Sequence, residues 1–247
     1  MKAREIVQNI ENEVSLPEGK GDRFAGYAVI GLPFRSGHVL AMRRFPASSI
    51  GAGYTSVWHR SPKGEWTFYS TVPPEQGCSK YFGGEIQRNV VTPIDIKWTS
   101  AAVFRVLIAD ALDWEVTLTE SALSRLMNGI ARLLPETWWQ AALVLKAMGY
   151  AARLGLGTGR MNLTGTTPNG QHFIANPQRF WLIDSSSALI NGDDAGPVGP
   201  LTPQASLNDF LIPQRGVFAV ARAFLNTPVA TGGEPHAIKN QSCALSR

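Results

Sequence analysis

The strongest constraint on the fold is a pair of short alternating segments around a turn, residues 53–71, GYTSVWHRSPKGEWTFYST. β-Branched and aromatic residues dominate both arms, which is typical of strands. The residues between the arms, Ser61-Pro62-Lys63-Gly64, are turn sequence. Proline presets φ for the second position of a turn, and glycine supplies a positive φ at its end. The segment therefore predicts a β-hairpin.

The side chains of this hairpin would divide between the two faces of a sheet. Tyr54, Trp58 and Arg60 share one face of the first arm, whereas Val57 and His59 share the other. Because the side-chain period of a strand is two residues, a shift of one residue exchanges the faces. The sequence leaves open which set faces the interior.

Similar short segments recur along the chain at spacings near 8–12 residues, which favours an antiparallel sandwich or barrel. The sequence Pro168-Asn169-Gly170 marks a turn between two of them and predicts a second hairpin. The expected fold class is therefore mainly β. Beyond the first hairpin, the expected strands are 24–32, 37–45, 79–87, 94–99, 102–109, 114–119, 160–166, 171–175, 180–183, 187–190 and 218–225.

Two segments carry helical periodicity instead. Residues 2–14 fit one short amphipathic helix, and residues 120–154 fit two helices separated by Pro135. We interpret the second segment as a helical hairpin that packs on the sheet, with a lid over a cavity or a dimer contact as alternatives. The chain would then be a single β-barrel domain over residues 1–225 with this insertion, followed by a flexible tail at 226–247.

Composition narrows the class of protein. Apolar residues make up 44% of the chain and charged residues 17%, as in ordinary globular domains. The net charge is +4, but the basic residues are scattered, so no nucleic-acid partner is expected. The N-terminal segment lacks an apolar signal sequence, and no run of about 18 apolar residues exists. We therefore expect a cytoplasmic protein without a transmembrane segment.

The familiar cofactor and metal motifs are missing from the sequence. The four histidines lack the spacings of common metal sites, and the two cysteines form no CxxC pair. The glycines at 155, 157 and 159 end an expected helix, whereas a dinucleotide-binding motif opens one after a strand. No GxSxG hydrolase motif is present. We expect no cofactor and no metal.

Ionisable and aromatic side chains inside the strand patterns are the better lead to a site. Alternate positions of a barrel strand face its interior, and an unsatisfied polar group there costs about 1–3 kcal/mol. A solvated outer face is the alternative for each residue taken singly. Among these side chains only His59 has an ordinary pKa suited to proton transfer near neutrality. The predicted catalytic residues are His59, Asp184, Tyr69 and Asp95, and the predicted substrate-binding residues are Tyr54, Trp58, Trp66, Phe68, Arg44 and Trp98.

Three segments together resemble a known family. They are YTSVWHRSPKGEWTFY, then IDIKWTS followed by AVFRVLI, and RMNLTGTTPNGQHF. Their pattern of repeated short strands resembles that of calycin-type proteins of the AttH and carotenoid-hydratase group, over residues 24–119 and 160–225. The resemblance implies a lipocalin-like β-barrel around an apolar ligand. It also implies hydration, cyclisation or isomerisation of terpenoid or polyketide molecules.

These observations predict a protein that binds a hydrophobic small molecule, such as a terpenoid, polyketide or lipid-like compound, in a barrel cavity. Cofactor-independent acid–base chemistry would then transform it, as in a lyase, hydratase or isomerase. Two alternatives stay open. One is a non-catalytic carrier of an apolar ligand, and the other is a partner-binding module that uses helix 136–154, including a homodimer through residues 120–154.

Overall fold

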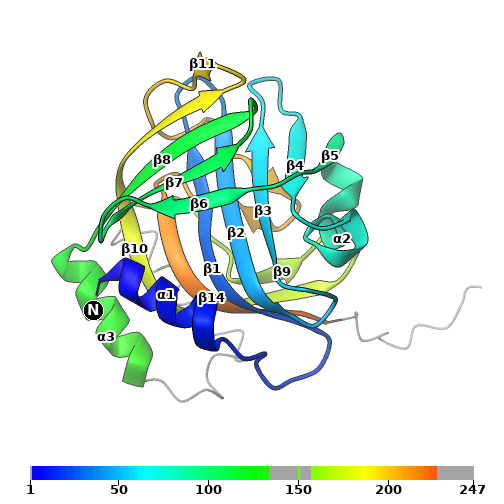
Figure 1. Cartoon of the computed structure of the whole chain (residues 1–247), viewed down its shortest axis with the longest axis vertical. Helices are drawn as coiled ribbons and strands as arrows, with labels where there is room; N and C mark the ends of the chain where they lie inside the picture. The colour runs from blue at the N-terminus through cyan, green and yellow to red at the C-terminus, as the bar shows by residue number, and fades with distance from the viewer. Residues whose placement is uncertain (1, 134–149, 151–156, 227–247) are drawn as a thin grey trace, which may run out of the picture.

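The computed structural model describes residues 2–133, 150 and 157–226. It contains one strongly curled sheet of twelve strands, so the expected mainly β, barrel-like fold class is confirmed (Figure 1). The strands of this sheet are β1 (Asp22–Pro33), β2 (Val39–Ser48), β3 (Tyr54–Arg60), β4 (Trp66–Ser70), β5 (Arg88–Val91), β6 (Asp95–Trp98), β7 (Val103–Ile108), β8 (Leu112–Thr119), β9 (Thr164–Thr166), β10 (His172–Ile190), β11 (Asp193–Asp194) and β14 (Val217–Asn226).

The order of the strands explains the curl. The main path runs β5-β4-β3-β2-β1-β14-β10-β8-β7-β6, with β9 and β11 paired to β10 outside it. Its pairs are antiparallel except β4 with β5, which are parallel. The two end strands, β5 and β6, are consecutive in the chain and joined by Thr92, Pro93 and Ile94. Since consecutive Cα atoms lie about 3.8 Å apart, the two ends of the sheet must lie within about 15 Å of each other.

Both expected hairpins are present. β3 pairs with β4 around the turn, where Gly64 has φ +91° and its N–H donates to the Ser61 carbonyl over 2.9 Å. β9 pairs with the start of β10, and Gly170 in their turn has φ +84°. A positive φ is strained for residues with a Cβ, so glycine at these two places fixes the turns.

Strand β10 combines segments expected to be separate. It runs without a break from His172 to Ile190, across the expected strands 171–175, 180–183 and 187–190. Its pairing shifts register between Pro177 and Arg179 and between Ile183 and Ser185. Such bulges bend a strand and increase its twist. The first part of β10 therefore pairs with β14 and the second part with β8.

The strand expected at 79–87 is wrong. The structure has a short helix there, α2 (Ser79–Phe82), between the 3-10 turns η1 (Pro74–Gln76) and η2 (Gly83–Glu85). Tyr81 and Phe82 are adjacent, and both are buried in one apolar cluster. A strand would send them to opposite faces, whereas a helical turn places both on the same layer.

The remaining elements cover the sheet. Helix α1 (Ala3–Glu13) confirms the first expected helix, and α3 (Ala122–Leu133) confirms the first half of the expected helical hairpin. A small separate hairpin consists of β12 (Ser206–Leu207) and β13 (Phe210–Leu211). Helix 136–154, apart from Tyr150, and the tail from 227 onward lie outside the described residues. Within the described residues, no helix is long and apolar enough to cross a membrane.

Two apolar clusters lie on the two faces of the curled sheet. The first includes Val57 of β3 and Val106 of β7, which belong to strands near opposite ends of the sheet, so it fills the inside of the curl; Ala3 and Val7 of α1 join it. The second lies on the outer face, between strands such as β2 and β3 and the covering α2 and β12–β13. Strand β3 is thus buried on both faces from Tyr54 to Trp58, whereas His59 and Arg60 at its end are partly exposed.

Candidate functional site

A chamber lies within the outer-face cluster, under the β12–β13 hairpin, and we call it the outer chamber. It has two adjoining compartments, of about 90 and 110 Å³. Both are lined by Arg43, Phe45, Ala175, Phe210 and Ala223. The smaller one, the aromatic compartment, is also lined by Phe24, Tyr54, Trp58, Cys78, Tyr81, Phe82, Thr167, Phe173, Ile174 and Leu225. The larger one, the aliphatic compartment, is also lined by Gly26, Tyr27, Ala28, Ile30, Met161, Asn162, Leu163, Pro177, Leu211, Ala219, Ala221 and Arg222.

Arg43 is the polar side chain at the junction of the two compartments. Its position on β2 alternates with Val39, Ala41 and Phe45, so its side chain joins the outer-face cluster and is only 5% exposed. The guanidinium carbon lies 3.3 Å from the ring centroid of Trp58, and Nη2 donates to the Ile30 carbonyl over 3.3 Å. Nη1 has no hydrogen-bond partner among the described residues.

Within the part of the chain that the structure describes, no counter-charge balances Arg43. No aspartate or glutamate lines either compartment, and Arg43 forms no ion pair within the described part of the chain. Burial lowers the pKa of Arg43 to about 10, so it stays charged at neutral pH. A desolvated cation–π contact contributes about 2 kcal/mol, whereas an unpaired buried ion costs several kcal/mol. Stacking on Trp58 therefore offsets only part of the cost.

The other titratable groups of the aromatic compartment are neutral. Tyr54 Oη and Cys78 Sγ lie 3.2 Å apart in a hydrogen bond. Burial raises the pKa of the Tyr54 hydroxyl well above its usual range and also raises the pKa of the Cys78 thiol. Both groups therefore keep their protons at neutral pH and supply no counter-charge to Arg43.

Stacked aromatic rings hold the Arg43 contact in place. Trp58 stacks on Phe68 with centroids 4.3 Å apart, and its indole N–H donates to Ser56 Oγ over 3.1 Å. On the covering side, the Phe210 ring lies 5.1 Å from the Arg43 guanidinium carbon and 6.0 Å from the Phe82 ring. Phe210 belongs to a hairpin whose strands pair only with each other among the described strands. Phe210 lines both compartments and Leu211 lines the aliphatic one, so the hairpin forms part of the cover of both.

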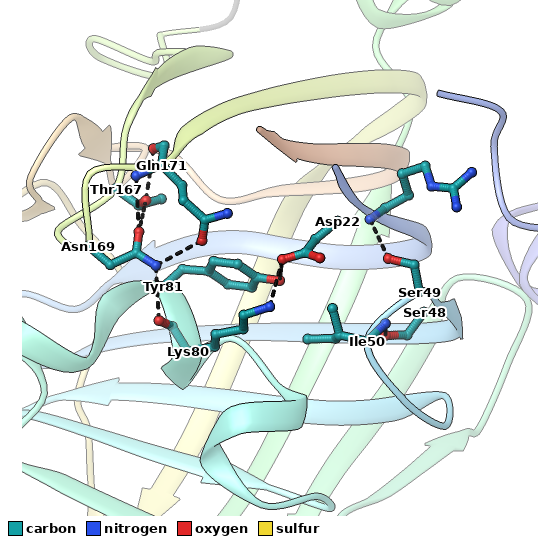
Figure 2. A network of polar contacts seen from close by, with 10 residues as sticks. Asp22, Ser48, Ser49, Ile50, Lys80, Tyr81, Thr167, Asn169 and Gln171 are labelled. Atoms are coloured by element: carbon teal, nitrogen blue, oxygen red, sulfur yellow. Dashed lines mark hydrogen bonds and ion pairs between the residues drawn. The ribbon is translucent and has the colours of Figure 1, made fainter. Parts of the chain in front are cut away.

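A polar network fixes the rim of the aromatic compartment (Figure 2). Asp22 accepts a hydrogen bond from Tyr81 Oη over 2.9 Å and forms an ion pair with Lys80 Nζ over 2.8 Å. Asn169 Nδ2 donates to the Lys80 carbonyl over 3.1 Å and to Gln171 Oε1 over 2.9 Å. These contacts connect α2 to β1 and to the turn between β9 and β10, which positions the Tyr81 ring against the compartment.

Two of the predicted substrate-binding residues line this chamber, and two more pack behind them. Tyr54 and Trp58 line the aromatic compartment. Phe68 lies behind Trp58, and Trp66 packs edge-on against Phe68, with centroids 6.3 Å apart. All four are buried in the outer-face cluster.

Three further predicted residues meet at a different place. Arg44, Asp95 and Trp98 line a wide open groove of about 780 Å³ beside α1. There Arg44 forms a bidentate ion pair with Glu11, which also accepts a hydrogen bond from Tyr27 over 2.8 Å. Unlike Arg43, Arg44 has its counter-charge within the protein, so this groove offers no uncompensated charge at that position.

The remaining predicted catalytic residues are dispersed. Asp184 is exposed on β10, and Tyr69 is half-buried on β4 against the inner cluster. His59 lies on β3 with its Nε2 2.9 Å from Nδ1 of His38. Burial and the neighbouring His38 lower the pKa of His59 to about 4. None of these three lines the outer chamber, and their catalytic roles stay predictions.

Sequence reasoning missed Arg43, Phe173 and Phe210 as site residues. The signal for Arg43 was the alternation Val39-Ala41-Arg43-Phe45, in which a cation occupies an apolar face. This alternation is hard to recognise, because a strand buried on both faces has no polar face with which the apolar face can be compared. Phe173 and Phe210 reach the chamber from distant strands, and no local pattern marks them.

Comparison with known proteins yields distant fold likenesses alone. No protein-family model matches the chain, and no curated protein matches it either. A crystal structure of acetoacetate decarboxylase from Legionella pneumophila subsp. pneumophila str. Philadelphia 1 is 12% identical, covers 89% of this chain and 93% of that chain, and has a TM-score of 0.37. Another structure of acetoacetate decarboxylase is 11% identical, covers 92% and 96%, and has a TM-score of 0.41. We draw no functional argument from likenesses of this size, and the resemblance to the AttH group stays a prediction.

Proposed function

We propose that the protein binds a small apolar molecule in the outer chamber, between the outer face of the sheet and the β12–β13 hairpin. The observation that carries the proposal is the two-compartment space walled by aromatic and aliphatic side chains, with Arg43 at its centre. Small-molecule sites are typically apolar hollows with a few placed polar groups. The sequence predicts a ligand inside the barrel, whereas this chamber lies on the outer face of the sheet.

The volumes support a small ligand. Each compartment is close in scale to a cavity of about 150 Å³ that holds benzene. A ring or a short alkyl chain therefore matches one compartment, and a larger polyketide or carotenoid would require the hairpin to move. Carriage of the ligand unchanged needs nothing beyond this space.

Acid–base transformation of the ligand is a second candidate. The observation that favours it is the hydrogen-bonded pair of Tyr54 and Cys78 inside the aromatic compartment. Both retain their protons, and their raised pKa values make both weak acids, so either can donate a hydrogen bond to negative charge that develops on a bound molecule. Neither serves as a base at neutral pH. His59 and Asp184, predicted as catalysts, would have to act from outside the chamber.

A filling substitution tests the binding proposal. Ala223 lines both compartments, so Ala223→Leu should occupy the space while leaving the apolar character of β14 intact. Titration of the purified protein with 1-hexanol, followed by ligand-observed NMR, should show saturable binding that this variant loses. Ala122→Leu, on an exposed position of α3, is the matched control and should bind as the parent does. Equal binding by Ala223→Leu would overturn the proposal.

Native mass spectrometry separates the carrier from the enzyme. A molecule that co-purifies with the protein identifies the ligand, and incubation with that molecule then shows whether it changes. Turnover that disappears in Tyr54→Phe would support a role for the tyrosine hydroxyl. Turnover lost in His59→Ala or Asp184→Ala, with folding intact, would instead restore the residues predicted from sequence.

A further inference from the structure

The unbalanced charge of Arg43 specifies the chemistry of the molecule in the chamber. The guanidinium is almost fully buried, and its Nη1 N–H groups have no partner among the described residues. Both compartments meet at this group. A buried polar group normally has a hydrogen-bond partner, so an orphaned cation beside an apolar space calls for an acceptor that enters that space.

The acceptor has to be negatively charged. Among the described residues no carboxylate lines either compartment, and Arg43 forms no ion pair. Tyr54 and Cys78 are neutral at physiological pH because burial raises the pKa of each. A neutral acceptor could accept a hydrogen bond from Arg43 Nη1, but it would leave the charge of Arg43 uncompensated in an apolar environment.

From these contacts we infer that the chamber takes a monocarboxylate with an apolar body, whose carboxylate accepts hydrogen bonds from the Arg43 guanidinium. The inference rests on the proposed function and names the ligand class for the same site. Guanidinium and carboxylate groups match in planar geometry, and a charge-assisted pair is stronger than a neutral hydrogen bond. One cation without an ion pair among the described residues matches one negative charge.

The compartments on either side of Arg43 set the size of the apolar body. The aromatic compartment, with Phe82, Phe173 and Trp58 in its walls, matches a phenyl ring or an alkyl chain of similar bulk. The aliphatic compartment offers comparable room. Hexanoate and phenylacetate are therefore suitable probes.

Paired probes of equal shape test the inference. Isothermal titration calorimetry should compare hexanoate with hexanamide, which differ in charge but hardly in size. We expect hexanoate to bind the full-length protein at least about tenfold more tightly, because a charged hydrogen bond replaces a neutral one. Arg43→Met should reduce this ratio to about one.

Two variants serve as controls. Arg44→Met removes the neighbouring cation, whose guanidinium is paired with Glu11 on the other face, and should keep the preference for hexanoate. Arg43→Lys keeps the charge but not the planar fork, and should keep part of the preference. It also provides the comparison if Arg43→Met does not fold.

The outcomes separate this inference from the proposed function. Equal affinity for hexanoate, hexanamide and 1-hexanol, all abolished by Ala223→Leu, would overturn the carboxylate inference and leave the binding proposal standing. No binding of any probe would overturn both. A preference for hexanoate that survives in Arg43→Met but disappears in Arg44→Met would place the anion elsewhere and also overturn the inference.

Discussion

Arg43 and Arg44 are consecutive on β2, yet their guanidinium groups lie on opposite faces of the sheet in opposite electrostatic surroundings. Arg44 is paired with Glu11 at 2.7 Å, whereas Arg43 stacks on Trp58 with no carboxylate paired to it in the described residues. Alternation along a strand produces this separation, because successive side chains point to opposite faces. One arginine therefore stabilises the fold through α1, and the other is left for a ligand.

Replacing Arg43 by methionine should stabilise the ligand-free protein. Methionine has similar length, fills the same apolar space and removes the cost of an unpaired buried charge, so we expect a gain of about 1–2 kcal/mol in the free energy of unfolding. Urea denaturation at neutral pH measures it. Arg44→Met is the matched comparison and should lose up to about 1 kcal/mol, because its ion pair with Glu11 is partly exposed. A large loss of stability in Arg43→Met would show that its charge is compensated in the native state.

Glu11 should make stability depend on pH in the acid range. Burial by itself would raise its pKa, but hydrogen bonds from Arg44 and Tyr27 outweigh burial and hold the pKa below the ordinary value of 4.5. Stability from Glu11 is therefore present above pH 4.5 and is lost as the pH falls through the lowered pKa. Glu11→Gln should flatten that part of the profile in thermal unfolding between pH 3 and 5, and an unchanged slope would contradict the assignment.

His59 should cause a separate loss of stability as the pH falls, in a pH range above that of Glu11. Its pKa falls from 6.5 to about 4 in the folded protein, because of burial first and His38 second. The unfolded chain thus takes up a proton that the folded chain refuses, so stability is constant above pH 6.5 and decreases from there to about pH 4. The shift corresponds to a loss on the order of 3 kcal/mol. His59→Gln should remove it, whereas His172→Gln, at an exposed residue beside Thr164, should leave it in place.

Phe210 should control closure of the chamber. Its ring is half-buried and lies against Trp58, Phe82 and Phe173, with centroids 5.7–6.0 Å away. Phe210→Ala should weaken binding of hexanoate about tenfold, since the loss of apolar contact is worth about 1–2 kcal/mol. Phe34 lies in the inner cluster and does not line the chamber, so Phe34→Ala is a control that destabilises the fold without changing the chamber. Unchanged affinity in Phe210→Ala would mean that the hairpin does not cover the ligand.

Local sequence determined much of the β architecture. The turn at Gly64 and the turn at Gly170 could be identified directly, since each needs a conformation that glycine supplies. Alternating aromatic and β-branched residues gave β3 and β4, and helical periodicity gave α1 and α3. The prediction of a strand at 79–87 was wrong, because adjacent aromatic residues are as compatible with a short helical turn as with a strand.

The site depended on tertiary structure. Tyr54 and Trp58 were identifiable from the hairpin, but sequence alone could not decide between two faces when the fold buries both. The surroundings of Arg43 come from Ile30 on the neighbouring strand and Phe210 far along the chain, and no carboxylate among the described residues lines its chamber. Strand periodicity is a local property that one segment displays by itself. Charge balance and enclosure arise between segments, and for that reason only the folded chain shows which of two neighbouring arginines has no ion-pair partner among the described residues.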